Sequence, residues 1–299
     1  MKVGYPCLNR TIGCTPGRTF RLASYSAGRL AEAVNWNLDC LERILEFNRD
    51  NGLLFFRVTS DLIPFASHPV CVFPWPQKFA RRFDVLGRLI RHSGMRISMH
   101  PDQFTLINSP DEGIFRRSIA ELAYHARVLD LLGLDRTARI QIHAGGAYGD
   151  KPGSLDRFCL RFERLDEPVR RRLVVENDDR LYGIADCLEI SRRTRVPVLF
   201  DSFHHRLNNR GESAAEALRL AAATWKRSDG PPMVDYSSQK RSERRGSHAE
   251  SIDLAHFARF IATTGDMDFD IMLEIKDKEK SALRAREQLV KMKRIPEGQ

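Results

Sequence analysis

Short apolar runs alternate with longer amphipathic segments along the whole chain. Eight runs rich in Val, Ile, Leu and Phe occur at 2–6, 53–58, 96–100, 139–143, 172–177, 197–201, 232–237 and 270–275. Their brevity and nearly continuous apolar character are typical of strands that are buried on both faces. The runs therefore predict a sheet that other elements cover on both sides.

The segments between the runs repeat apolar residues at helical spacing. In the first of them, Leu30, Val34, Leu38, Leu41 and Leu45 fall on one face. The predicted helices cover 29–51, 79–92, 112–132, 155–165, 181–193, 213–223, 254–263 and 282–292. Strict alternation of strand and helix favours a parallel sheet, and eight units in 299 residues fit a closed (β/α)8 barrel. We expect an α/β protein with a single TIM-barrel domain spanning 1–299.

Polar side chains follow the predicted strands at the carboxyl ends, where such barrels build their active sites. A lone histidine at a strand end is more often a hydrogen-bonded structural residue than a ligand, so the recurrence in most of the units carries the argument. Several buried carboxylates and imidazoles need compensation, which divalent cations supply. The candidate ligands are His100, His143, Glu176, Asp201, His204, Asp235, His248 and Glu274.

This set exceeds the donors that one ion needs, so we expect two or three ions per chain. Mixed imidazole and carboxylate ligands suit Zn²⁺, Mn²⁺ or Fe²⁺ better than Ca²⁺. Two-metal sites stabilise the attacking and leaving oxygens of phosphodiester hydrolysis. The strand ends thus point to a metal-dependent phosphodiesterase.

Charge and composition bear on the partner and the compartment. The net charge of +9 and the pI of about 9.4 are compatible with a nucleic-acid partner, or simply with a basic surface. The six cysteines form no C-x-x-C pair, so neither a zinc ribbon nor a disulfide framework is expected. No signal peptide or membrane span is recognisable, which predicts a cytoplasmic protein that associates with the nucleoid when it binds DNA.

Several motifs together resemble one known family. In chain order they read "GYPCLN", "LIPFASHP", "SMHPDQF", "IHAGGAYGDK", "VVENDDRL", "FDSFHH" and "LEIKDKE", from residue 3 to about residue 280. They are similar to the UV damage endonucleases, relatives of endonuclease IV among the metal-dependent TIM barrels. The resemblance implies ATP-independent hydrolysis of double-stranded DNA immediately 5′ to cyclobutane dimers and 6-4 photoproducts, with abasic sites as a further substrate.

The resemblance also implies roles for individual residues. Seven of the eight candidate ligands above, all except Asp235, recur as its metal ligands. Glu176, Glu274 and His143 are implied to take part in catalysis, and Mn²⁺ is the usual ion, with Zn²⁺, Co²⁺ or Mg²⁺ as alternatives. Asp235 departs from the pattern, since relatives usually have His there, and Met233 stands where some have Lys. We expect a shifted metal preference from the first change.

Lesion and DNA contacts are implied as well. The lesion pocket would be lined by Tyr5 and Asn9, and Gln103 with Phe104 would fill the gap left in the duplex; relatives usually have Tyr in place of this Phe. Further DNA contacts are expected from His68, Tyr148, Lys240, Arg241, Arg244 and Arg245. The protein is expected to act as a monomer.

Two other functions fit parts of the pattern. A sugar isomerase or epimerase of the same barrel type would use similar ligands, but the positive charge and the basic segment 238–248 count against it. A DNA-binding protein that uses metal only for structure would normally surround each ion with four protein ligands. The excess of candidate ligands in this chain argues instead for an open site. Retention on a DNA column, and loss of activity without loss of fold in Glu274→Ala, would separate these alternatives.

Overall fold

The strands form one closed barrel in the computed structural model of the chain, which describes residues 1–296. Each strand pairs in parallel with the next, and the last pairs with the first, so no sheet edge stays open. The strands are β1 (Val3–Pro6), β2 (Phe55–Val58), β3 (Arg96–Met99), β4 (Arg139–His143), β5 (Leu173–Glu176), β6 (Val198–Asp201), β7 (Met233–Tyr236) and β8 (Asp270–Leu273). The predicted TIM barrel is confirmed, with strand bounds that differ by at most two residues at either end.

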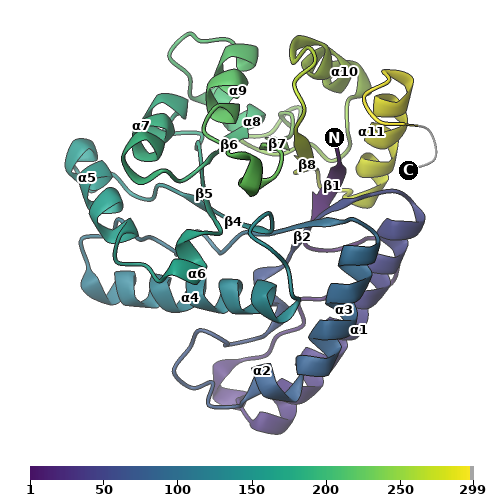
Figure 1. Cartoon of the computed structure of the whole chain (residues 1–299), viewed down its shortest axis with the longest axis vertical. Helices are drawn as coiled ribbons and strands as arrows, with labels where there is room; N and C mark the ends of the chain where they lie inside the picture. The colour runs from purple at the N-terminus through teal and green to yellow at the C-terminus, as the bar shows by residue number, and fades with distance from the viewer. Residues whose placement is uncertain (297–299) are drawn as a thin grey trace.

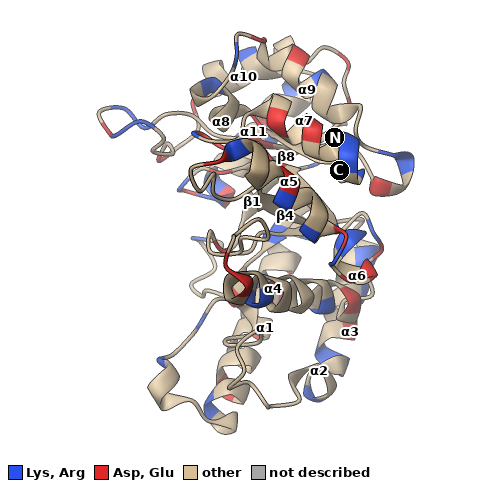
Figure 2. Ribbon diagram, turned by 90° about the vertical axis from the view of Figure 1, so that its left-hand side faces the viewer, with Lys and Arg blue, Asp and Glu red and all other residues tan. Residues whose placement is uncertain are grey.

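Helices surround the barrel, and their apolar faces pack on the outer side of the strands (Figure 1). They are α1 (Ala27–Asp50), α2 (Trp75–Lys78), α3 (Ala80–His92), α4 (Glu112–Leu131), α5 (Lys151–Phe162), α6 (Glu167–Arg170), α7 (Ile184–Thr194), α8 (Ser202–Leu207), α9 (Ala214–Ala222), α10 (Leu254–Thr263) and α11 (Glu279–Lys291). Charged residues of both signs are interspersed over this outer ring (Figure 2). None of the helices in the described residues is long and apolar enough to cross a bilayer.

Side-chain caps fix where several of the long helices begin. Asp111 accepts a hydrogen bond from the backbone N–H of Ile114 at 2.7 Å, and Ser213 accepts one from Glu216. Such caps satisfy N–H groups that have no partner within the helix. The short helices α2, α6 and α8 were not predicted, because a single turn carries too few residues to show helical periodicity.

The barrel interior consists of layers because alternate residues of each strand point inward. One layer is an apolar plug, made by Phe55, Val174, Leu199, Met233 and Met272. Two residues further along the same strands, the inward positions become polar, and they carry Arg57, Glu176, Asp201, Asp235 and Glu274. The plug therefore forms an apolar floor under a layer of charged groups.

One disulfide, between Cys14 and Cys40, corrects an expectation from the sequence. It joins the loop after β1 to α1, with the two Cα atoms 5.9 Å apart. The absence of a C-x-x-C motif argued against disulfides, but these cysteines are 26 positions apart and meet only through the packing of the loop on the helix. Cys7, Cys71, Cys159 and Cys187 are free.

Candidate metal and DNA-binding site

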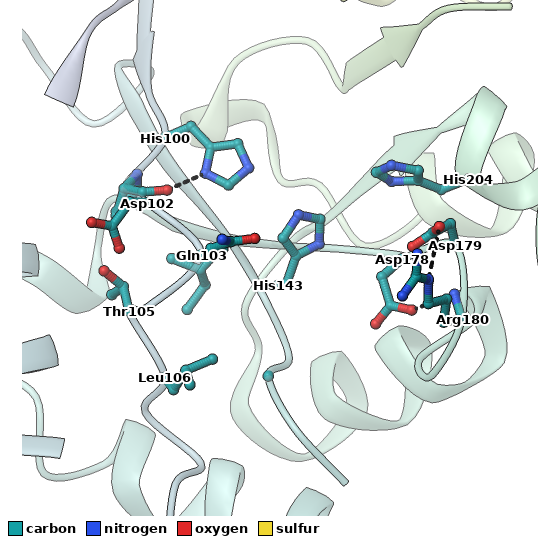
Figure 3. Close-up of a pocket in the computed structure, with 13 residues that line it drawn as sticks. His100, Asp102, Gln103, Thr105, Leu106, His143, Asp178, Asp179, Arg180 and His204 are labelled. Atoms are coloured by element: carbon teal, nitrogen blue, oxygen red, sulfur yellow. Dashed lines mark hydrogen bonds and ion pairs between the residues drawn. The ribbon is translucent and has the colours of Figure 1, made fainter. Parts of the chain in front are cut away.

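Glu176 is surrounded by three imidazoles at the carboxyl end of the barrel. Its side chain is 1% exposed, and Oε2 lies 3.5 Å from Nε2 of His100 and 3.8 Å from Nε2 of His143. The other oxygen, Oε1, lies 3.2 Å from Nδ1 of His204. Figure 3 shows the three imidazoles lying across one pocket, with segment 100–106 on one side and 178–180 on the other. His100 directly follows β3, His143 and Glu176 are the last residues of β4 and β5, and His204 lies in helix α8.

Backbone carbonyls orient the imidazoles. The Nδ1 atom of His100 lies 2.8 Å from the carbonyl of Pro101, and that of His248 lies 2.7 Å from the carbonyl of Glu274. An Nδ1–H that donates to a carbonyl leaves the lone pair of Nε2 free, which is the usual arrangement of a metal-binding histidine. These rings are therefore held in the orientation that a metal ligand needs.

Asp201 has two separate roles at the junction of β6 and α8. Its Oδ1 accepts hydrogen bonds from the backbone N–H groups of Phe203 at 2.6 Å and His204 at 2.7 Å, which caps α8. Its Oδ2 is buried without a hydrogen-bond partner among the described residues and lies 3.5 Å from Nδ1 of His204. A buried carboxylate oxygen without a donor is costly unless a cation completes it. The residues present thus fit a bound cation.

Three groups of potential ligands lie next to one another in the site. Within each group the ligand atoms are all within 4.8 Å of one another. The groups are His100–His143–Glu176, Glu176–Asp201–His204 and Asp201–Asp235–Glu274. Neighbouring groups share Glu176 or Asp201, so each of these carboxylates would contribute ligand atoms to two groups.

Two polar residues of this layer were not predicted as part of the site. Arg57 in β2 is 3% exposed; its Nη2 donates to Oδ2 of Asp235 at 2.6 Å, and its Nη1 contacts Oε1 of Glu274. Gln141 in β4 donates from Nε2 to Glu176 and to Asp235, at 2.8 Å each. The sequence did contain a sign of them, because each is a polar residue within a largely apolar run: Arg57 in "FFRV" and Gln141 in "RIQI".

Charge coupling governs the pKa values of the metal-free site. Burial alone would raise the pKa of Glu176, but the charge of His143 and hydrogen bonds from His100 and His204 hold it well below its usual range. Burial raises the pKa of Asp201 to about 6 despite the charge of His204. For His204, burial is outweighed by the charge of Asp201 and by Glu176, which together raise its pKa to about 11. In the metal-free site, the charge of His204 therefore offsets part of the negative charge of Glu176 and Asp201.

The pocket over these residues has a volume of about 370 Å³. It is bordered by His100, Gln103, His143, Asp178, Arg180 and His204. Phe104, which follows Gln103, is 72% exposed, and its backbone N–H donates to Oδ1 of Asp102 at 2.8 Å. A large aromatic ring so exposed beside the pocket contributes little to the core and is available to a partner.

The other predicted lesion contacts differ in accessibility. Tyr5 is fully buried, donates from its hydroxyl to Asn48 at 2.7 Å and accepts a hydrogen bond from Asn9, which is itself 3% exposed. Tyr5 therefore supports Asn9 from the core, and its ring has no open face for a base. His68 is exposed, lies outside the three ligand groups and accepts a hydrogen bond from the backbone of Val70.

Tyr148 and the basic loop lie at the surface. Tyr148 is 44% exposed, and the guanidinium of Arg157 lies 5.7 Å from its ring centroid. Lys240 is held by Glu243 at 3.2 Å and by Glu250 at 2.9 Å, and Arg245 donates to the carbonyl of Leu207.

The two remaining cations of this loop differ from Lys240 in their exposure and in their lack of an ion pair among the described residues. Arg241 and Arg244 are exposed and make no ion pair within residues 1–296. Arg245 also has no carboxylate partner in the described part of the chain, so the unneutralised charge of the loop lies on Arg241, Arg244 and Arg245, of which the first two are the least constrained.

Comparison with known proteins places the chain in a family. The model of the family described as UV-endonuclease UvdE matches residues 1–298. The UV DNA damage endonuclease of Clostridium perfringens is 36% identical over 286 residues, which are 95% of this chain and 69% of that protein. The crystal structure of SacUVDE has a TM-score of 0.95 at 43% identity, and the match covers 99% of this chain and 100% of the other.

More distant structures share the fold alone. Endonuclease IV of Thermus thermophilus has a TM-score of 0.58 at 17% identity, and the match covers 84% of this chain and 95% of the other. Sugar epimerases share the barrel at similarly low identity. The family match over nearly the full length separates the chain from these epimerases: it belongs to the UV-endonuclease UvdE family.

Proposed function

We propose that the chain hydrolyses the phosphodiester bond immediately 5′ to UV photoproducts in duplex DNA, without ATP. Cyclobutane dimers and 6-4 photoproducts are the proposed lesions, with abasic sites as a further substrate. One observation carries the proposal: Glu176 lies between two groups of ligands that share it, at the open end of the barrel. Paired divalent ions bridged by a carboxylate are suited to in-line displacement at phosphorus.

The proposed ligands of these ions are His100 and His143 for one group and Asp201 and His204 for the other, with Glu176 common to both. Mn²⁺ is the proposed ion, and the mixed imidazole and carboxylate donors also suit Zn²⁺ and Co²⁺. When bound, such ions would polarise the phosphate and lower the pKa of an attacking water. The side chains would hold the ions, while the carbonyls of Pro101 and Asn177 keep the imidazoles of His100 and His204 in place.

Exposed cations near the site support DNA rather than a small sugar as the substrate. Phosphate contacts position a duplex and make its binding depend on salt, because counterions are released. The exposed side chains of Arg241 and Arg244, in the loop that follows β7, are proposed to make such contacts. The direct test of the function is Mn²⁺-dependent incision of UV-irradiated plasmid by the purified chain.

We expect the double substitution Arg241→Ala and Arg244→Ala to weaken DNA binding and to flatten its salt dependence. Each lost phosphate contact should lower the slope of log affinity against log salt by about 0.9. Lys240→Ala is the matched control, since Glu243 and Glu250 already neutralise that charge. Affinity measured by anisotropy over a series of salt concentrations checks this; equal slopes for the double variant and the control would contradict it.

A further inference from the structure

We infer that the site holds two divalent ions rather than three, and that Arg57 provides a permanent cation at the third group of carboxylates. The inference rests on the proposed metal-dependent function and narrows its ion count. It concerns the group Asp201–Asp235–Glu274, whose spacing alone would suit a metal ion.

The guanidinium of Arg57 already bridges two of the three carboxylates in this group. Nη2 donates to Oδ2 of Asp235 at 2.6 Å, and Nη1 contacts Oε1 of Glu274. Asp235 is fully buried and Arg57 is 3% exposed, so water screens the pair little. A guanidinium keeps its charge at all physiological pH values and offers its donors in a fixed planar fork. A metal ion at this point would meet a like charge that cannot be removed by deprotonation.

Gln141 reinforces the arrangement from the neighbouring side. Its Nε2 donates to the same Oδ2 of Asp235 that Arg57 contacts, and also to Oε2 of Glu176. Oδ2 of Asp235 therefore accepts two hydrogen bonds, and a metal ion that bound this oxygen would have to displace one of them. The first two ligand groups have no arginine in contact with their carboxylates among the described residues.

The formal charges lead to the same count. The layer contains four carboxylates, those of Glu176, Asp201, Asp235 and Glu274, with a charge of −4. Two divalent ions contribute +4 and Arg57 contributes +1, which leaves one positive charge for the phosphodiester of a bound strand. A third ion would raise the excess to +3 inside a buried layer, where uncompensated charge is expensive.

One oxygen could still serve a third ion. Oδ1 of Asp235 is buried and has no hydrogen-bond partner among the described residues. Asp235→Asn is therefore the discriminating variant. It keeps the shape and the buried volume, and it removes a metal ligand only if Asp235 is one.

The experiment is equilibrium dialysis of the full chain against Mn²⁺, with elemental analysis of ions per chain. We expect two ions for the unmodified chain, two for Asp235→Asn, and fewer than two for the matched variant Asp201→Asn. Arg57→Met, which removes the fixed cation at similar length, should admit a third ion. Circular dichroism checks that each variant is folded, and if Arg57→Met does not fold, the first two measurements decide.

Each alternative result has a separate meaning. Three ions in the unmodified chain, or a loss of bound metal in Asp235→Asn, would overturn this inference and leave the proposed endonuclease intact. No bound Mn²⁺ in the unmodified chain would overturn the proposed metal-dependent function itself, and the inference with it.

Discussion

Glu176→Gln is expected to abolish incision and most of the metal binding at the same time. The carboxylate faces His100, His143 and His204 and belongs to two ligand groups, so an amide at this position removes a bridging charge from both. Loss of an outer-shell partner of a metal ligand typically costs 10–100-fold, so a shared ligand should cost on the order of a thousandfold or more in incision rate.

Incision rate and Mn²⁺ content of the folded variant together check this expectation. Glu189→Gln is the matched control, because Glu189 lies on the outer helix α7 and pairs only with Arg192 within the described chain. A Glu176→Gln protein that retained both its metal and its activity would show that the chemistry lies elsewhere.

Phe104→Ala is expected to weaken binding to UV-damaged duplex roughly tenfold or more, while leaving thermal stability unchanged. Stacking of a base on an aromatic ring is worth about 1–3 kcal/mol. Damaged bases stack and pair poorly, so the gap they leave on extrusion is less costly to open and can be filled by a wedge. The ring is 72% exposed beside the pocket, which makes it available for this role.

A purely structural role for Phe104 would be packing beneath the loop after β3. Its exposure is at odds with that role, and truncation should therefore cost little stability. Leu160→Ala on α5 offers a control, since that apolar side chain is 70% exposed and lies outside the pocket. An equal loss of affinity for damaged and undamaged DNA in Phe104→Ala, or a large fall in melting temperature, would contradict the wedge.

The regular alternation of apolar runs was enough to predict the barrel and the end of it that carries the site. Residues at strand ends, such as His143 and Glu176, could be predicted because the fold brings all carboxyl ends to one face. The short helix α8 could not be predicted in this way. Its capping residue Asp201 was interpreted only as a ligand, although Oδ1 caps the helix and only Oδ2 has no hydrogen-bond partner among the described residues.

Residues that act through tertiary partners escaped prediction for a physical reason. Arg57 and Gln141 stand inside apolar runs, and only the inward layering of β2 and β4 shows that they meet Asp235. The Cys14–Cys40 pair likewise depends on how a loop lies on a helix. Sequence spacing carries information about position along a strand, but not about which inward groups neutralise one another across the barrel.

The most direct test of the central claim is incision of UV-irradiated plasmid by the purified chain with Mn²⁺. We expect nicking of irradiated plasmid, none above background on undamaged plasmid, and full loss of nicking when a chelator removes the metal. Sequencing of the cut should place it immediately 5′ to the photoproduct, with 3′-hydroxyl and 5′-phosphate ends. Equal nicking of both plasmids, activity that survives the chelator, or a 3′-unsaturated aldehyde at the cut would contradict the account.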